Sequence, residues 1–432
     1  MKVPDLPPAP PAPPTSRKAV AAWCLFDWAT NGWPTVVSSF VFAAYITRAV
    51  APNPEVGTLW WGVATAISGI VIAVLSPIFG AMADRGGRRK PWVGAFIAMT
   101  IVVSLFLWFI EPRPEHLLLG VFLIALGGTT FEISQVFYNA MLSDVAPRGK
   151  VGRVSGWAWA AGYAGGLTCL ITALVLFVLP EPPLFGLDPE MEEPTRASAF
   201  VVAAWFILFG WPFFVLVPDR PSSGLRFGLA ARAGLAQVRE SLRTLLPKYR
   251  DIAHFLLARM IYTDGLNTLF VFGGIYAAGT FGMGFREILV FGIILNIAAG
   301  LGALAFAWVD DWIGPKRTII ISLVCLIVFG TVALLVETVQ ALYFAASALG
   351  IFIGPVQAAS RSMMAQISPE HMKTEMFGLY ALSGKVTAWA GPFLVGWATY
   401  LADSQRVGMA TILLFFVVGL LLLLPLKAPA RD

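Results

Sequence analysis

Long apolar stretches recur along nearly the whole chain, and this feature constrains the fold most. A helix that spans a bilayer needs about 20 mostly apolar residues. The sequence is 58% hydrophobic and only 13% charged, with a mean hydropathy of +0.76. We therefore predict an all-α integral membrane protein with twelve transmembrane helices. The expected spans are 19–48, 57–83, 92–110, 115–143, 151–178, 197–217, 252–279, 286–310, 318–336, 339–366, 373–401 and 406–426.

The spans divide six and six around the basic segment 218–250. This predicts an N-terminal six-helix bundle (19–217), a C-terminal six-helix bundle (251–426) and a linker between them. An amphipathic pattern over 228–250 indicates an interfacial helix in that linker, with leucine-rich and arginine-rich stripes side by side. The proline-rich residues 1–18 and the residues 427–432 are expected to be solvated tails.

The basic residues sort by loop. With the N-terminus inside, the outer loops hold Arg48, Arg113, Arg196, Arg286 and Arg406, whereas most of the 30 lysines and arginines fall in the inner loops and tails. The positive-inside rule then predicts that both termini lie in the cytoplasm. This sorting, rather than one basic patch, argues against nucleic-acid binding.

The two halves carry matching segments in the same order. Residues 80–90, GAMADRGGRRK, follow the second span, and residues 307–317, AWVDDWIGPKR, follow the eighth. Residues 138–147, YNAMLSDVAP, match residues 360–369, SRSMMAQISP, and the glycines that follow keep the same offset. The order of these matches predicts an internal duplication, and two six-helix repeats are typical of one class of secondary transporter.

The segment Gly-x-x-x-Asp-Arg-x-Gly-Arg-Arg at 80–89 is similar to the best-known loop motif of the major facilitator superfamily. Residues 23–29, WCLFDWA, and 255–268, FLLARMIYTDGLNT, resemble one branch of it, the autophagy-linked vacuolar amino-acid effluxers and their bacterial homologues. The resemblance implies alternating access by two rocking bundles, amino acids as substrates, proton coupling, and a monomer in a bacterial inner membrane.

The loop motif supplies the residues expected to gate the inner end. Asp84 can face the positive N-terminal end of a neighbouring helix and a nearby guanidinium group, and so hold the halves together in the outward-facing state. Glycines allow close approach and tight turns. The alternative is a basic anchor without a gating role. The predicted gating residues are Gly80, Asp84, Arg85, Gly87, Arg88 and Arg89, with Asp311 and Gly314 in the second half.

Six ionisable residues lie well within the predicted spans, away from their ends: Asp27, Glu132, Arg259, Asp264, Arg361 and Lys385. Each opposes insertion by about 2.5–3.5 kcal/mol at a helix centre, so they are expected to face the bundle interior. Glu132 is a candidate for binding a proton or a substrate amine. Arg361 and Lys385 are candidate partners for a carboxylate, either that of Glu132 or that of a substrate. The alternative is that all six form structural ion pairs.

Further polar residues extend this candidate site. Asn31 lies one turn beyond Asp27, which is expected to act at the inner gate or in coupling. Arg259 and Asp264 are expected to meet if helix 7 unwinds at Gly265. The remaining substrate-binding or coupling candidates are Gln135, Tyr163, Tyr262 and Asn267.

The sequence disfavours other classes of function. The three cysteines and three histidines form no metal-binding or disulfide pattern, and no Walker-type loop or nucleophile–base pair is present. We therefore expect no cofactor, no metal and no enzyme activity. The partners expected are a small-molecule substrate, protons and the lipid bilayer. The function predicted is secondary transport of a small polar or zwitterionic solute. A drug or metabolite exporter, and a non-transporting sensor or assembly factor, are the alternatives.

Overall fold

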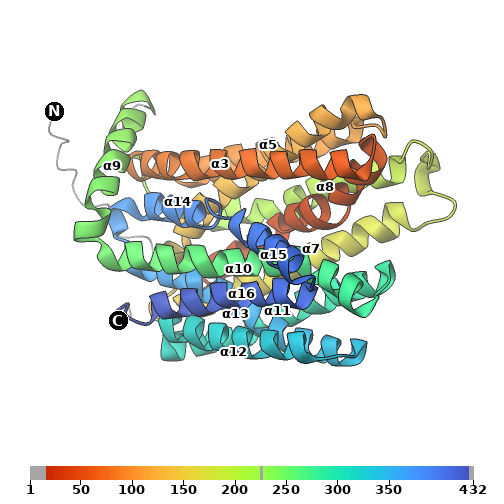
Figure 1. The fold of residues 1–432 in the computed structure, drawn as a ribbon. Helices are drawn as coiled ribbons and strands as arrows, with labels where there is room; N and C mark the ends of the chain where they lie inside the picture. Colours follow the sequence, from red (N-terminus) through yellow and green to blue (C-terminus); the bar gives the residue numbers. More distant parts are fainter. Residues whose placement is uncertain (1–15, 224–226, 428–432) are drawn as a thin grey trace.

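The computed structural model describes residues 16–223 and 227–427, and almost all of them lie in helices. Most helices run side by side along one direction, whereas α9 (Phe227–Lys248) lies across one end of the bundle (Figure 1). We call this end the termini end, because α1 (Arg17–Thr30) begins there and α16 (Gln405–Leu423) ends there. The opposite end is called the far end.

The first half of the chain forms six spans. They are the segment made of α1, η1 (Trp33–Phe40), α2 (Phe42–Tyr45) and η2 (Ile46–Val50), followed by α3 (Pro54–Gly86), α4 (Lys90–Phe106), α5 (Leu117–Ala140), α7 (Val151–Ala173) and α8 (Glu193–Leu216). The first span is not the continuous α-helix expected over 19–48. Gly32 and Pro34 follow α1, and a proline has no N–H for the regular hydrogen-bond ladder, so the chain continues as π-helix.

The second half repeats this arrangement. Its helices are α10 (Arg250–Phe281), α11 (Phe285–Ile313), α12 (Pro315–Leu335), α13 (Val339–Ile367), α14 (Lys373–Ser383), α15 (Ala390–Ala402) and α16. The predicted span 373–401 is interrupted, because residues 384–389 between α14 and α15 form turns. We call residues 384–389 the α14–α15 break.

Nine helices among the described residues are long and apolar enough to cross a membrane by themselves. The other three predicted spans correspond to the α1–η2 segment, to α10, and to α14 with α15. Together they form two six-helix bundles, the major facilitator fold predicted from the sequence.

The two bundles meet along α3 with α14 and along α7 with α11 and α13. Small residues allow these helices to approach closely. A Cβ added at Gly80 of α3 would lie 2.8 Å from the Thr374 carbonyl carbon of α14. A Cβ added at Gly156 of α7 would lie 2.9 Å from the Cα of Ala307 in α11. Such glycines bring helix backbones together, so both contacts can be tight.

The helix α9 covers most of the segment 228–250, where an interfacial helix is predicted. It packs on α3 through Gly234, Gln237 and Ser241, which face the bundle, while Leu235 of the predicted apolar stripe is exposed. An exposed leucine beside the arginines is the arrangement of a helix that lies at a membrane surface. The side chains of Leu242 and Leu245, also assigned to that stripe, lie outside the described residues.

Candidate functional site

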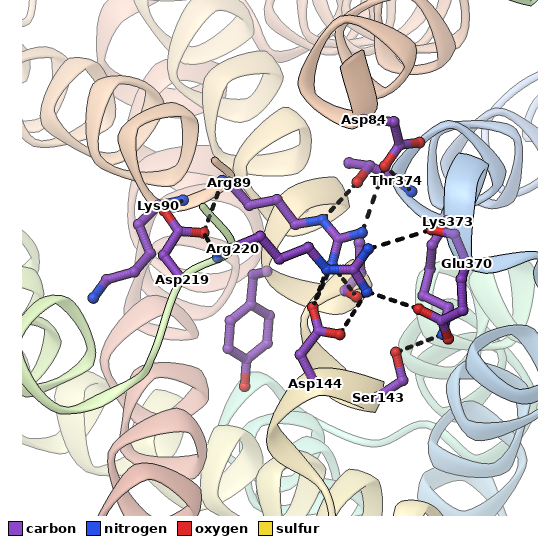
Figure 2. A network of polar contacts seen from close by, with 12 residues as sticks. Asp84, Arg89, Lys90, Ser143, Asp144, Asp219, Arg220, Glu370, Lys373 and Thr374 are labelled. Atoms are coloured by element: carbon purple, nitrogen blue, oxygen red, sulfur yellow. Dashed lines mark hydrogen bonds and ion pairs between the residues drawn. The ribbon is translucent and has the colours of Figure 1, made fainter. Parts of the chain in front are cut away.

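Asp84 caps a helix of the opposite half at the termini end. Its two carboxylate oxygens accept hydrogen bonds from the backbone N–H groups of Thr374 (3.1 Å) and Glu375 (2.9 Å), in the first turn of α14 (Figure 2). The first N–H groups of a helix have no partner within it, and they form its positive end. A carboxylate from α3 therefore holds α14 against the first bundle.

Arg89 extends this contact. Its guanidinium is almost fully buried and donates to the Thr374 hydroxyl (2.7 Å), to Asp144 (2.7 Å) and to the carbonyl of Ala140 (2.9 Å), with Asp84 at 3.5 Å. The Arg89 side chain thus uses most of its N–H donors, and these hydrogen bonds reach residues of both halves.

A second set of charges adjoins the first and shares Asp144 with it (Figure 2). Arg220 binds Asp144 (2.6 Å) and also Glu370 (2.8 Å), which lies in the opposite half. Lys373 contacts Glu370 as well and donates to Ser143 (2.7 Å). Desolvation raises the pKa of Glu370, but the attraction of Lys373 and Arg220 outweighs it and holds the pKa below its ordinary value of 4.5. We call the contacts around Asp84, Arg89, Asp144, Arg220 and Glu370 the termini-end network.

The second half supplies the matching cap. Asp311 accepts a hydrogen bond from the backbone N–H of Arg153 (3.0 Å) in the first turn of α7 and pairs with the Arg153 side chain (3.1 Å). Gly314 has a φ of 88°, which favours glycine and lets the chain turn sharply into α12. The acids after the second and eighth spans therefore make equivalent contacts, each with a helix of the other half.

The remaining residues of the predicted gating loop have separate environments. Gly87 has a φ of 88° and lies against the backbone of Pro221. Arg85 donates to Gln237 of α9 (2.5 Å), whereas Arg88 is exposed. The predicted gating loop contains Arg85, Arg88 and Arg89, and of these three arginines Arg89 contacts Asp84.

Deeper in the bundle, Asp27 of α1 pairs with Arg361 of α13 across the two halves (2.9 Å). Both side chains are buried. Arg361 also donates to Asn139 (3.1 Å) and to the hydroxyl (3.0 Å) and carbonyl (2.8 Å) of Ser155, and it lies against the ring of Trp23. With so many buried partners, this guanidinium is not available to a solute in this conformation.

Glu132 of α5 and Lys385 of the α14–α15 break form a different kind of pair. Their charged atoms are 2.6 Å apart, and the two side chains are 31% and 32% exposed. The pair also joins the halves, but it is only partly desolvated. A competing charged group can therefore displace either partner more easily than in the buried pair of Asp27 and Arg361.

Two candidates of the first half support packing in this structure. The amide of Asn31 donates to the Asp27 carbonyl of its own helix (2.8 Å) and lies against Gly162 of α7. Gln135 donates to Thr30 (3.3 Å). Both bonds stay within the first bundle.

The other polar candidates do not form one cluster. Tyr163 bonds to Gln357 of the other half (2.5 Å), whereas Tyr262 is buried and bonds to Ser360 within its own half (2.7 Å). Asn267, on the same helix as Tyr262, is exposed. The two candidates on this helix therefore lie on different faces.

The expected meeting of Arg259 and Asp264 is wrong. The helix α10 is continuous through Gly265, so residues five apart stay on different faces. Arg259 instead donates to the Tyr380 carbonyl (2.5 Å) and the Ser383 hydroxyl (2.7 Å) at the end of α14. No unwound turn is present at Gly265 in α10, the seventh span. The interrupted helix is instead the eleventh span, at residues 384–389.

Sequence reasoning missed the partners supplied near the ends of the spans: Asp144, Asp219, Arg220, Glu370 and Lys373. They lie between spans or at the first residue of a helix, where a charge is ordinary and gives no hydropathy signal. One signal was present, because Asn139 and Arg361 occupy matching places in the two repeated segments 138–147 and 360–369, and the structure brings them into contact.

Comparison with known proteins shows the family to which the chain belongs. Residues 62–430 match the family described as vacuole effluxer Atg22 like. The chain belongs to this family. It is 26% identical over 407 residues to the uncharacterized MFS-type transporter YxiO of Bacillus subtilis (strain 168), covering 93% of each chain. It is 22% identical over 384 residues to autophagy-related protein 22 of Pichia angusta, covering 76% of this chain and 68% of that protein.

Solved structures show the same fold at low sequence identity. The human organic anion transporter MFSD10 superposes with a TM-score of 0.71 at 14% identity, covering 95% of this chain and 100% of that one. The proton:xylose symporter XylE gives a TM-score of 0.71 at 14% identity and covers 94% of each chain. The fold and the family together show that this Atg22-like chain is a multi-pass membrane protein and a secondary transporter of the major facilitator type.

Proposed function

We propose that this transporter moves a small zwitterionic solute of the amino-acid class, with proton coupling at Glu132. The observation that carries the proposal is the pair of Glu132 and Lys385. It places one acid and one base opposite each other, from different halves, at 2.6 Å. An amino acid carries the two complementary charges, so its ammonium group can bind Glu132 while its carboxylate binds Lys385.

The partial exposure of this pair supports the assignment. A solute that replaces the pair exchanges one set of charge contacts for another, whereas disrupting the buried contacts of Arg361 would leave charges without partners. The solute ammonium group and a proton compete for the Glu132 carboxylate, so the carboxylate holds one or the other. This competition links release of the solute to binding of a proton.

The termini-end network and the deeper pair of Asp27 and Arg361 suggest how access alternates. We propose that the termini-end network and the Asp27–Arg361 pair form the closed gate of an outward-facing state, with the termini end in the cytoplasm and the protein acting as a monomer in a bacterial inner membrane. The halves (19–217 and 251–426) would rock about the Glu132–Lys385 level. Basic residues crowded at the termini end support this orientation.

The test is counterflow in proteoliposomes with a panel of amino acids, with and without a pH gradient. Glu132→Gln and Lys385→Gln are each expected to reduce uptake about tenfold or more, because each loses a charge-assisted hydrogen bond of about 1.5–3 kcal/mol. Glu132→Gln should also abolish dependence on the pH gradient. Arg113→Gln, an exposed change far from the pair, is the matched control.

The outcomes separate the alternatives. Normal uptake at all pH values in Glu132→Gln would contradict both roles of Glu132. An exporter of drugs or metabolites would transport many unrelated compounds and lose little when Lys385 is changed. A sensor would bind a ligand, raising the thermal unfolding midpoint, without counterflow.

A further inference from the structure

The α14–α15 break creates two helix ends within the eleventh span. Arg259 of α10 meets the first end, where its guanidinium binds the Tyr380 carbonyl (2.5 Å) and stacks on the Tyr380 ring (3.4 Å). A cation at the C-terminal end of α14 is favourable, because the last carbonyl groups of a helix have no partner within it and carry partial negative charge.

Asp264, also on α10, lies at the other end of the break. It is 1% exposed. The hydroxyl of Thr387, inside the break, is also buried and faces this carboxylate, which it attracts as a hydrogen-bond donor. A hydroxyl carries no positive charge, so it cannot neutralise the carboxylate.

Among the residues that the structure describes, no basic side chain forms an ion pair with this carboxylate. Arg259 is engaged with α14, and Lys385 binds Glu132. The elements packed on Asp264 add no charge here: Gly391 of α15 lies against its backbone, and Phe415 and Phe416 of α16 lie against the adjacent Gly265. Thr268 directs its hydroxyl to the backbone carbonyl of Asp264 (2.7 Å) rather than to the carboxylate. A buried carboxylate in such surroundings needs a counter-charge.

We propose that Asp264 and Thr387, with the backbone of the α14–α15 break, form a binding site for a monovalent cation of the sodium type. A sodium ion prefers oxygen ligands, and in transporters interrupted helices supply them from backbone carbonyl groups. The ion would supply the positive charge that the Thr387 hydroxyl lacks, and it would bind the carboxylate and the Thr387 oxygen together. The site is separate from Glu132 and does not depend on which solute is carried.

The consequence concerns the eleventh span. The ion would join α10 to the break that carries Lys385, so ion occupancy would fix the position of the lysine proposed to bind a solute carboxylate. Sodium binding and the geometry of the solute site would then be coupled through three residues of chain, from Lys385 to Thr387.

The test uses the purified full-length protein in detergent, without any solute. Sodium chloride replaces choline chloride at constant ionic strength, and the thermal unfolding midpoint is followed, with potassium chloride in a parallel titration. Wild type should show a saturable, sodium-dependent rise. Asp264→Asn should lose the rise, and Thr387→Val should need about tenfold more sodium to reach half of it. Asp403→Asn, an exposed acid at the end of α15, should behave as wild type.

Other outcomes overturn the proposal. If wild type shows no sodium-specific rise, or if Asp264→Asn shows the same rise as wild type, this site does not bind the ion. A midpoint that depends on pH but not on sodium, and does so through Asp264, would make the site a proton site. Thr387→Val keeps the shape of the side chain, so it decides the question even if Asp264→Asn does not fold.

Discussion

At the scale of single residues, Asp84 and Asp311 are the most informative pair. They follow matching spans, and each caps the first turn of a helix in the opposite half, α14 and α7 respectively. The capped residues, Thr374 with Glu375 and Arg153, lie at matching places of the repeat. Each cap exists only while the halves are closed together at the termini end, so each stabilises that state specifically.

Replacing Asp84 by asparagine should slow transport more than it weakens solute binding. The amide keeps one acceptor but loses the negative charge that faces the end of α14 and the Arg89 guanidinium. Counterflow rate and binding midpoint, measured on the same preparation, give the two quantities. Unchanged turnover would contradict the gating role, and Arg88→Gln, at an exposed position of the same loop, serves as the control.

Breaking the buried pair of Asp27 and Arg361 should destabilise the protein strongly. Asp27→Asn leaves the Arg361 charge without its counter-ion, and removal of one partner of a buried pair costs about 3–5 kcal/mol. The thermal unfolding midpoint should therefore fall, and the double variant Asp27→Asn with Arg361→Gln should recover part of the loss. Normal transport and pH dependence in Asp27→Asn would rule out a gating or coupling role for this residue.

At the scale of elements, the contact between α3 and α14 depends on the absence of a side chain at Gly80. A Cβ there would lie 2.8 Å from backbone of α14, which cannot move alone, so Gly80→Ala should separate the two helices. The separation is measurable between spin labels at Arg148 and His371, which are exposed in opposite halves. The labelled distance should lengthen.

The same helix provides the control for this change. Gly86 has open space around the position of an added Cβ, so Gly86→Ala should leave the labelled distance as in wild type. Equal distances in wild type and Gly80→Ala would show that the close approach does not hold the termini end closed.

At the scale of the whole molecule, closure of the termini end should persist at neutral pH and weaken in acid. Glu370 pairs with Arg220 of the linker, which also binds Asp144 of the first half, and the pKa of Glu370 lies below 4.5. A carboxyl group whose pKa is lowered in the closed state stabilises that state above its ordinary pKa, and this contribution disappears as the pH falls through the lowered value. The Arg148–His371 distance should stay constant from pH 8 to about pH 5 and lengthen only in stronger acid.

The Glu370→Gln variant tests the cause of this acid response. It lacks the titrating group, so its labelled distance should change less in acid than that of wild type. An identical acid response in the two proteins would assign the effect to other carboxyl groups.

Much of the architecture is encoded locally. Apolar stretches long enough to span a bilayer, the sorting of basic residues and the repeated loop motif predicted the helical membrane fold, the two bundles and the family branch. The identity of the ionisable residues also followed, because a charge within an apolar stretch is conspicuous. The partners of these residues did not follow from the sequence. Arg259 was expected to meet Asp264, five residues away, if the helix unwinds at Gly265. It binds instead the end of α14, 121 residues further along the chain.

By itself, the sequence determined that the chain is a duplicated helical membrane protein and which buried residues carry charge, since both properties depend on residues close together in the chain. The tertiary structure alone decided that Asp27 pairs with Arg361 and Glu132 with Lys385, that the eleventh span is interrupted, and that Asp264 has no counter-charge. The physical reason is that pairing depends on which helix faces approach each other across the two halves, and this is set by packing of the whole bundle.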